Sequence, residues 1–91
     1  MKKEFPKELL TELCEEMPNF DYLIAFNAEE GNETGWRSIV RMIDANIGLQ
    51  QRMARVAKIT FGEADERVAR ANEAVEKFQG LKDRVQSFIS A

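Results

Sequence analysis

Few residues of this chain could carry out chemistry, because it contains no histidine. Imidazole is the usual general base and the commonest transition-metal ligand, and it belongs to the common catalytic dyads and triads. Glu12, Glu15 and Glu16 lie close together, and paired carboxylates can act as acid and base where a cleft shifts their pKa values. We place these three on the exposed side of a short helix, so the sequence predicts a protein without catalytic residues.

The only cysteine, Cys14, offers little more. One thiol cannot form an intramolecular disulfide or a cysteine metal cluster. Cys14 falls among leucines on an apolar helix face, and no imidazole is present to activate it, so we expect a buried and inert thiol. We therefore predict no metal site and no cofactor.

The stretch "GNETGW", residues 31–36, is the chain's nearest approach to a ligand-binding loop. Glycines let backbone amides converge on a phosphate, but no lysine follows this loop, and Glu30 and Glu33 would repel an anion. The pattern of a calcium loop is also absent. We read residues 31–35 as a polar connector, in which Gly31 ends one helix and Asn32 or Thr34 caps the next.

Charge is unevenly distributed along the chain, whose formal net charge is −3. Residues 1–35 are strongly acidic, whereas residues 36–61 carry five basic residues and one acid. At helical spacing these five bases fall within an arc of about 120°. We call them the basic strip: Arg37, Arg41, Arg52, Arg55 and Lys58.

The basic strip has three interpretations. It can bind a protein partner, together with Trp36 beside it; it can contact nucleic acid; or it can pair with the acidic N-terminal helices or stay solvated. The net negative charge, the pI near 5.0 and the lack of aromatic residues within the strip count against nucleic acid.

The elements that would position these residues are all helical. Two short helices are expected within residues 1–30, the first ended by Pro18. The apolar side of the first comprises Leu9, Leu10, Leu13, Cys14 and Met17. The buried side of the second comprises Phe20, Leu23, Ile24 and Phe26.

A long central helix is expected over residues 36–61, where no proline occurs. Its main apolar arc includes Trp36, Ile39, Ile43, Ala54 and Phe61. Beside this arc lies what we call the second flank: Met42, Leu49, Met53 and Val56. The two together span roughly 200°, more than the roughly 100° stripe of an ordinary surface helix, so this helix should contact neighbours on two sides.

The last helix, residues 64–90, carries a heptad pattern. Its seam comprises Ala64, Val68, Ala71, Val75, Phe78, Val85 and Ile89, with Lys82 as the exception and Leu81 and Phe88 alongside. Gly62 should end the central helix before this last helix begins, and Gly80 could interrupt the last helix. We predict a single all-α domain over residues 1–91, with an antiparallel hairpin of arms 36–61 and 64–90. One unbroken helix through Gly62 is the alternative.

What covers the second flank decides the assembly. Either the two short helices lie end to end along the hairpin in a compact monomer, or two hairpins pair as a four-helix-bundle dimer. We favour the homodimer. The chain has no apolar run approaching the roughly 20 residues of a membrane span and no signal peptide, so we expect a cytoplasmic protein with no membrane partner. The expected function is that of a small adaptor, inhibitor or assembly factor, with a nucleic-acid-associated regulator as the alternative.

Overall fold

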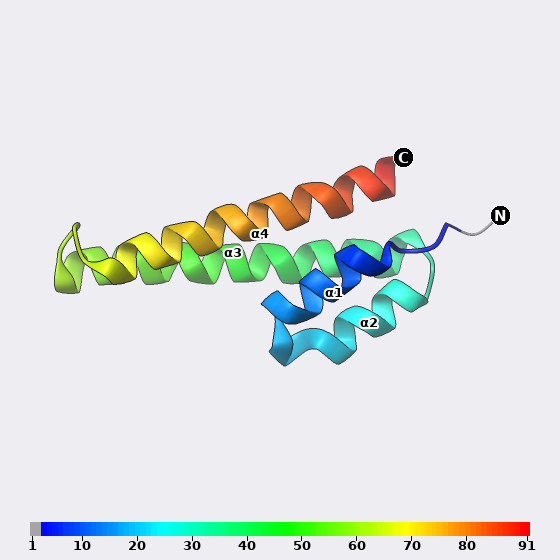
Figure 1. Cartoon of the computed structure of the whole chain (residues 1–91), viewed down its shortest axis with the longest axis horizontal. Helices are drawn as coiled ribbons and strands as arrows, with labels where there is room; N and C mark the ends of the chain where they lie inside the picture. Colours follow the sequence, from blue (N-terminus) through cyan, green and yellow to red (C-terminus); the bar gives the residue numbers. More distant parts are fainter. Residues whose placement is uncertain (1–2) are drawn as a thin grey trace.

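The structure, a computed structural model, describes residues 3–91 and is all-α, as predicted. Its helices are α1 (Lys7–Glu16), α2 (Asp21–Glu29), α3 (Glu33–Phe61) and α4 (Glu66–Ser90), with a 3₁₀ turn at Pro18–Phe20 between α1 and α2. The long helices α3 and α4 pair antiparallel (Figure 1). The radius of gyration, 14.8 Å, exceeds the roughly 12 Å of a compact domain of this length, so the molecule is elongated.

The hairpin reverses between Gly62 and Asp65. Gly62 has φ +102°, a conformation that side-chain-bearing residues rarely adopt, and it ends α3. Asp65 then caps α4, because its carboxylate accepts a hydrogen bond from the backbone N–H of Arg67 at 2.9 Å. These features exclude one unbroken helix through Gly62. The interruption considered at Gly80 does not occur, since α4 is continuous from Glu66 to Ser90.

The inner face of α4 follows the predicted heptad. Val68, Ala71, Phe78, Leu81 and Val85 are buried, and Val75 and Ile89 are half-buried. Ala64 is the exception, because it lies in the turn and is exposed. Lys82 is tolerated beside this seam because its ammonium reaches the Asp44 carboxylate of α3, 2.7 Å away.

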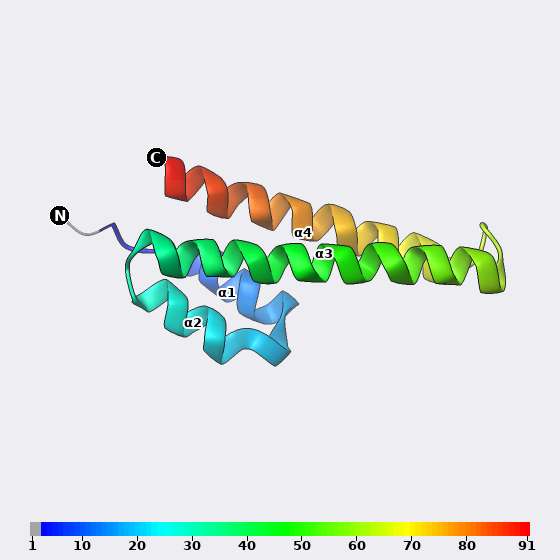
Figure 2. The same ribbon diagram turned by 180° about the vertical axis from the view of Figure 1, so that it is seen from behind.

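The short helices α1 and α2 lie side by side along one half of the hairpin, and not end to end as we considered (Figures 1 and 2). In this half α2 packs on α3, and α1 packs on both α2 and α4. One chain therefore builds a short four-helix bundle there by itself. The most deeply buried side chains come from all of these helices: Leu13, Ile24, Ile39, Ile43 and Val85.

The buried side of α2 differs from our prediction. Ile24 and Ala28 are buried, whereas Phe20, Leu23 and Phe26, which we expected inside, are exposed. The reason is that α2 has neighbours only in α1 and α3, so one narrow stripe of its surface meets the core. The opposite side of α2 therefore exposes large apolar residues to solvent.

The connector between α2 and α3 is shorter than predicted, because α3 begins at Glu33. Gly31 adopts φ +68°, and the Asn32 side chain accepts a hydrogen bond from the Gly35 N–H at 2.8 Å, as the capping interpretation requires. Gly35 has a second role. A Cβ atom there would lie 2.5 Å from the carbonyl oxygen of Asn27, so the close contact of α2 with α3 depends on this glycine.

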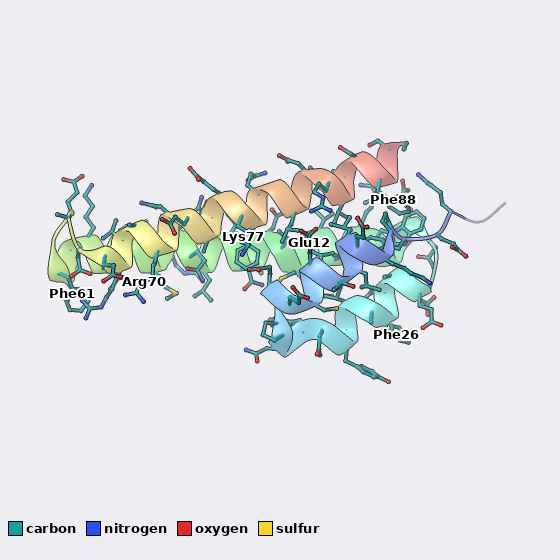
Figure 3. All side chains as sticks on the ribbon, viewed as in Figure 1. Glu12, Phe26, Phe61, Arg70, Lys77 and Phe88 are labelled. Carbon is teal, nitrogen blue, oxygen red and sulfur yellow. The ribbon has the colours of Figure 1, made fainter. Side chains whose placement is uncertain are left out.

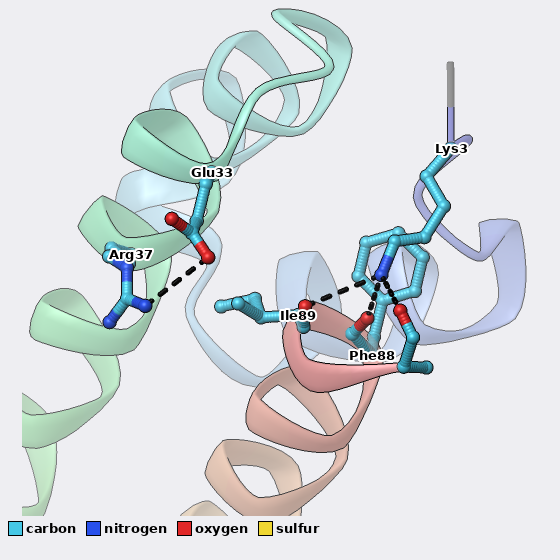
Figure 4. Close-up of polar contacts among 6 residues, drawn as sticks. Lys3, Glu33, Arg37, Phe88 and Ile89 are labelled. Atoms are coloured by element: carbon cyan, nitrogen blue, oxygen red, sulfur yellow. Dashed lines mark hydrogen bonds and ion pairs between the residues drawn. The ribbon is translucent and has the colours of Figure 1, made fainter. Parts of the chain in front are cut away.

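Aromatic side chains close the open end of the hairpin. Trp36 is buried and meets Phe88 edge-to-face, with ring centroids 4.7 Å apart, and Phe5 packs against the same ring at 5.3 Å. Lys3 lies over Phe88 and donates hydrogen bonds to the carbonyls of Phe88 and Ala91, at 2.6 and 2.7 Å (Figure 4). These bonds satisfy carbonyl groups that the end of α4 would otherwise leave free.

Candidate functional site

The main uncovered surface arises from a mismatch in helix length. At 1.5 Å per residue α3 is about 44 Å long, whereas α1 and α2 are about 15 and 14 Å long. The covered half reaches as far as Asn46, whose side-chain amide lies 3.2 Å from the sulfur of Met17 at the end of α1. Beyond this point α4 is the only helical neighbour of α3 within residues 3–91 (Figure 1).

The second flank crosses this boundary. Met42 lies in the covered half, is half-buried and packs against the core. The remaining three residues lie beyond it, and their side chains are 45%, 50% and 59% exposed at Leu49, Met53 and Val56. The predicted neighbours on two sides of α3 are thus confirmed for the covered half, whereas the rest of the second flank has no cover within the described chain. With Phe61, we call the exposed part the distal face: Leu49, Met53, Val56 and Phe61.

A groove of about 480 Å³ opens on the distal face. Its walls are mostly apolar, and two arginines lie at its rim; the lining residues are Arg52, Met53, Val56, Ala57, Phe61 and Arg67. We expected Phe61 on the buried arc, but it is half-exposed because the helix ends there. Its ring instead contacts the guanidinium of Arg67, at 3.9 Å from the centroid.

The basic strip lies on the exposed side of α3. Arg37 pairs with Glu33 at 3.2 Å, as Figure 4 shows, and Lys58 pairs with Glu63 at 3.1 Å. Among residues 3–91, no carboxylate lies within 4 Å of Arg41, Arg52 or Arg55.

The strip does not pair with the acidic N-terminal helices, so that part of the third interpretation is wrong, whereas its other part, a solvated face, stays open. Two of the carboxylates of α1 pair with α4 instead: Glu16 with Lys77 at 2.7 Å, and Glu12 with Arg84. Figure 3 labels Glu12 and Lys77, one member of each pair. Trp36 also lies apart from the strip, because only 5% of its surface is exposed. We had grouped it with the partner contacts, but its position in the aromatic core removes it from this surface.

The groups that could do chemistry are held in structural contacts. The hydrogen bond from Lys77 to Glu16 raises the pKa of the lysine and keeps it charged. Burial, and secondarily the charge of Asp21, raises the pKa of the Cys14 thiol, so little reactive thiolate forms at neutral pH. Across residues 3–91, no group of three or more His, Cys, Asp or Glu side chains is placed to hold a metal ion.

A second apolar surface, on α2, was missed by sequence reasoning. It comprises the exposed residues Phe20, Tyr22, Leu23 and Phe26, which we call the α2 outer face. A signal was present, because apolar residues occur around the whole circumference of "DYLIAFNAE". A helix of that kind needs cover on more than one side, and the chain supplies α2 with neighbours on one side only.

No helix within residues 3–91 has an apolar stretch long enough to span a bilayer. The exposed apolar side chains of the distal face and of the α2 outer face form surface patches, of the kind that marks protein interaction sites when they are contiguous. Comparison of the chain with models of protein families, with curated proteins and with solved structures found no match.

Proposed function

We propose that this chain is a non-enzymatic interaction module, an adaptor, inhibitor or assembly factor, that binds another protein through the distal face. The observation that carries this proposal is the half-exposed apolar row of Leu49, Met53 and Val56 beside a groove with arginines at its rim. Interface centres are typically apolar and enriched in methionine, aromatic residues and arginine. Flexible methionine side chains also suit a surface that adapts to its partner.

The surroundings of the distal face support binding without catalysis. The two carboxylates of α1 in ion pairs, Glu12 and Glu16, and the half-buried thiol of Cys14 lie in the four-helix half of the molecule, away from the groove. Homodimerisation belongs to the same proposal, because a second copy can cover apolar surface as well as a larger partner can. The single cysteine suits the cytoplasmic setting that we expect for such a module.

Affinity capture with three immobilised proteins tests this proposal. The wild type is compared with Met53→Glu/Val56→Glu, which places two charges on the distal face. The matched control is Gln51→Glu/Asn72→Glu, which adds the same charge at exposed positions outside the groove. We expect the wild type and the control to retain the same partner, and the distal-face variant to lose at least ten-fold of it while keeping its helical circular dichroism. Equal retention by all three proteins, or no specific partner for any of them, contradicts the proposal.

Nucleic-acid binding through the basic strip is the second candidate, favoured by the absence of ion pairs at Arg41, Arg52 and Arg55 within residues 3–91. Contacts to phosphates release counterions, so affinity for DNA or RNA should fall steeply with salt. Arg52→Ala/Arg55→Ala should then flatten that slope. An absence of binding to duplex DNA, single-stranded DNA and RNA at low salt removes this candidate.

A further inference from the structure

We propose that a second copy of this chain occupies the distal face, and that it does so through its α2 outer face in a reciprocal, two-fold symmetric dimer. This inference rests on the proposed function, since it names one partner of the same surface. It covers the distal face and the α2 outer face together, with one contact made twice.

The shape of the molecule provides the first argument. One half has four helices and the other has two, so a step lies near Asn46, which contacts Met17 directly after the end of α1 (Figures 1 and 2). At about 100° per residue, Met42, Leu49, Met53 and Val56 share an arc of about 60°, so the flank beside α2 continues past the step. Two such molecules placed antiparallel bring the thick half of each against the thin half of the other.

Charge provides the second argument. Between Lys7 and Arg37 the sequence contains no basic residue, and between Asp44 and Glu63 it contains no acidic residue. The α2 region therefore presents Asp21, Glu29 and Glu30, all exposed, around its apolar surface. The distal groove is lined by Arg52, which has no carboxylate within 4 Å among residues 3–91, and by Arg67, which also pairs with Asp65 at 3.3 Å. Opposite charges around matching apolar centres favour contact of α2 with the distal face over contact of either surface with itself.

The symmetry fixes a register. Within one chain α2 runs antiparallel to α3 (Figure 1), so in an antiparallel dimer the α2 of one copy runs parallel to the α3 of the other. The beginning of α2 then lies near Leu49 of the partner copy, and its end, with Glu29, lies near the Gly62 turn. Phe26 is accordingly placed beside Val56 of the partner copy.

This register can be tested by cross-linking, because the same two positions are far apart within one chain. Asn27 lies against Gly35, and Val56 is 21 residues further along α3, about 32 Å away. A disulfide requires Cα atoms within about 7 Å, so residues 26 and 56 of one chain cannot be joined. Any disulfide between these positions must therefore join two molecules.

The experiment uses Phe26→Cys/Val56→Cys in a Cys14→Ala background, oxidised after its mass in solution has been measured by light scattering. We expect the parent protein to show twice the 10.4 kDa chain mass, and the double variant to give covalent dimers containing a 26–56 disulfide. In a two-fold symmetric dimer each copy uses both of its surfaces on the other copy, so no surface is left for a third. Cross-linking should therefore stop at dimers and give no series of higher oligomers. The matched control, Phe26→Cys/Gln51→Cys, should cross-link at least ten-fold more slowly, because Gln51 points away from the distal face.

Three results would overturn the inference: a monomeric mass at millimolar concentration, cross-linking no faster than in the control, or a ladder of higher oligomers. The proposed function fails separately. If the wild type is a monomer and Met53→Glu/Val56→Glu loses a foreign partner, the proposed function is supported and the dimer is contradicted. If the protein cross-links as a dimer but captures no other protein, the dimer is supported and binding to a larger partner is contradicted.

Discussion

At the scale of single residues, two glycines in helices have opposite roles. Gly35 allows the carbonyl of Asn27 to approach within 2.5 Å of the place a Cβ would occupy, and the obstacle is backbone that cannot turn aside. Gly80 lies inside α4, is exposed and has no atom within 4 Å of that place. One glycine is therefore required by packing, and the other only weakens its helix.

This difference predicts opposite effects for the same substitution. Gly35→Ala should lower the free energy of unfolding by about 1–3 kcal/mol, because α2 must move away from α3. Gly80→Ala should raise it by about 0.5–1 kcal/mol, because alanine is the better helix former. Urea unfolding of both variants at one protein concentration measures the two changes. Stabilisation by Gly35→Ala would show that α2 does not pack as closely as described.

At the scale of helices, α3 has two environments along its length. From Ile39 to Asn46 it is covered by α4 on one side and by α2 on another, whereas beyond Asn46 only α4 remains as a helical neighbour within residues 3–91. Local opening requires less energy where fewer apolar contacts are broken. The two halves of one continuous helix should therefore open with different free energies.

Amide hydrogen exchange should reveal this gradient. In Met53→Glu/Val56→Glu, which cannot bury its distal face, amides of residues 53–58 should exchange at least ten-fold faster than those of residues 39–46. In the concentrated wild type, the distal amides should gain protection as the second copy covers them. Uniform exchange along α3 in the variant would contradict the two environments.

The sequence predicts the hairpin because its determinants are local. Gly62 ends α3, Asp65 caps α4, and the heptad from Val68 onwards marks the inner face within one helix. The placement of α1 and α2 depends instead on contacts between distant residues, such as Glu16 with Lys77 and Gly35 with Asn27. No periodicity within a single helix records such contacts.

The same limit applies to the candidate site. The second flank could be predicted, since Leu49, Met53 and Val56 follow helical spacing. Which part of it stays exposed could not, because this depends on where α1 and α2 dock. The direction of Phe26 was predicted wrongly for a related reason: with apolar residues on every side of α2, periodicity does not select the side that faces the core.

At the scale of the whole molecule, the position of the step determines the dimensions of the proposed dimer. Asn46 lies next to the midpoint of α3, which runs from Glu33 to Phe61. A two-fold axis there lays the two long helices alongside each other over their full length. Mass would double while the longest dimension stayed close to the 52 Å of one chain.

Small-angle X-ray scattering measures this directly. We expect the maximum dimension of the dimer to exceed that of the Met53→Glu/Val56→Glu monomer by less than a quarter. A dimer joined end to end through the Gly62 turns would approach twice the length of one chain. That outcome would place the contact at the tip of the hairpin and not along its side.

The hydrogen bonds from Lys3 to the last turn of α4 have a practical consequence. They hold residues 3 and 91 together at one pole of the molecule, with the Gly62 turn about 44 Å away, the length of α3. An affinity tag or a surface tether fused at either terminus therefore anchors the same pole. In a chain that has not dimerised, the opposite pole, with the groove beside Met53 and Phe61, then projects freely into solution. Interchanging the attachment point should leave its measured binding to a foreign partner unchanged.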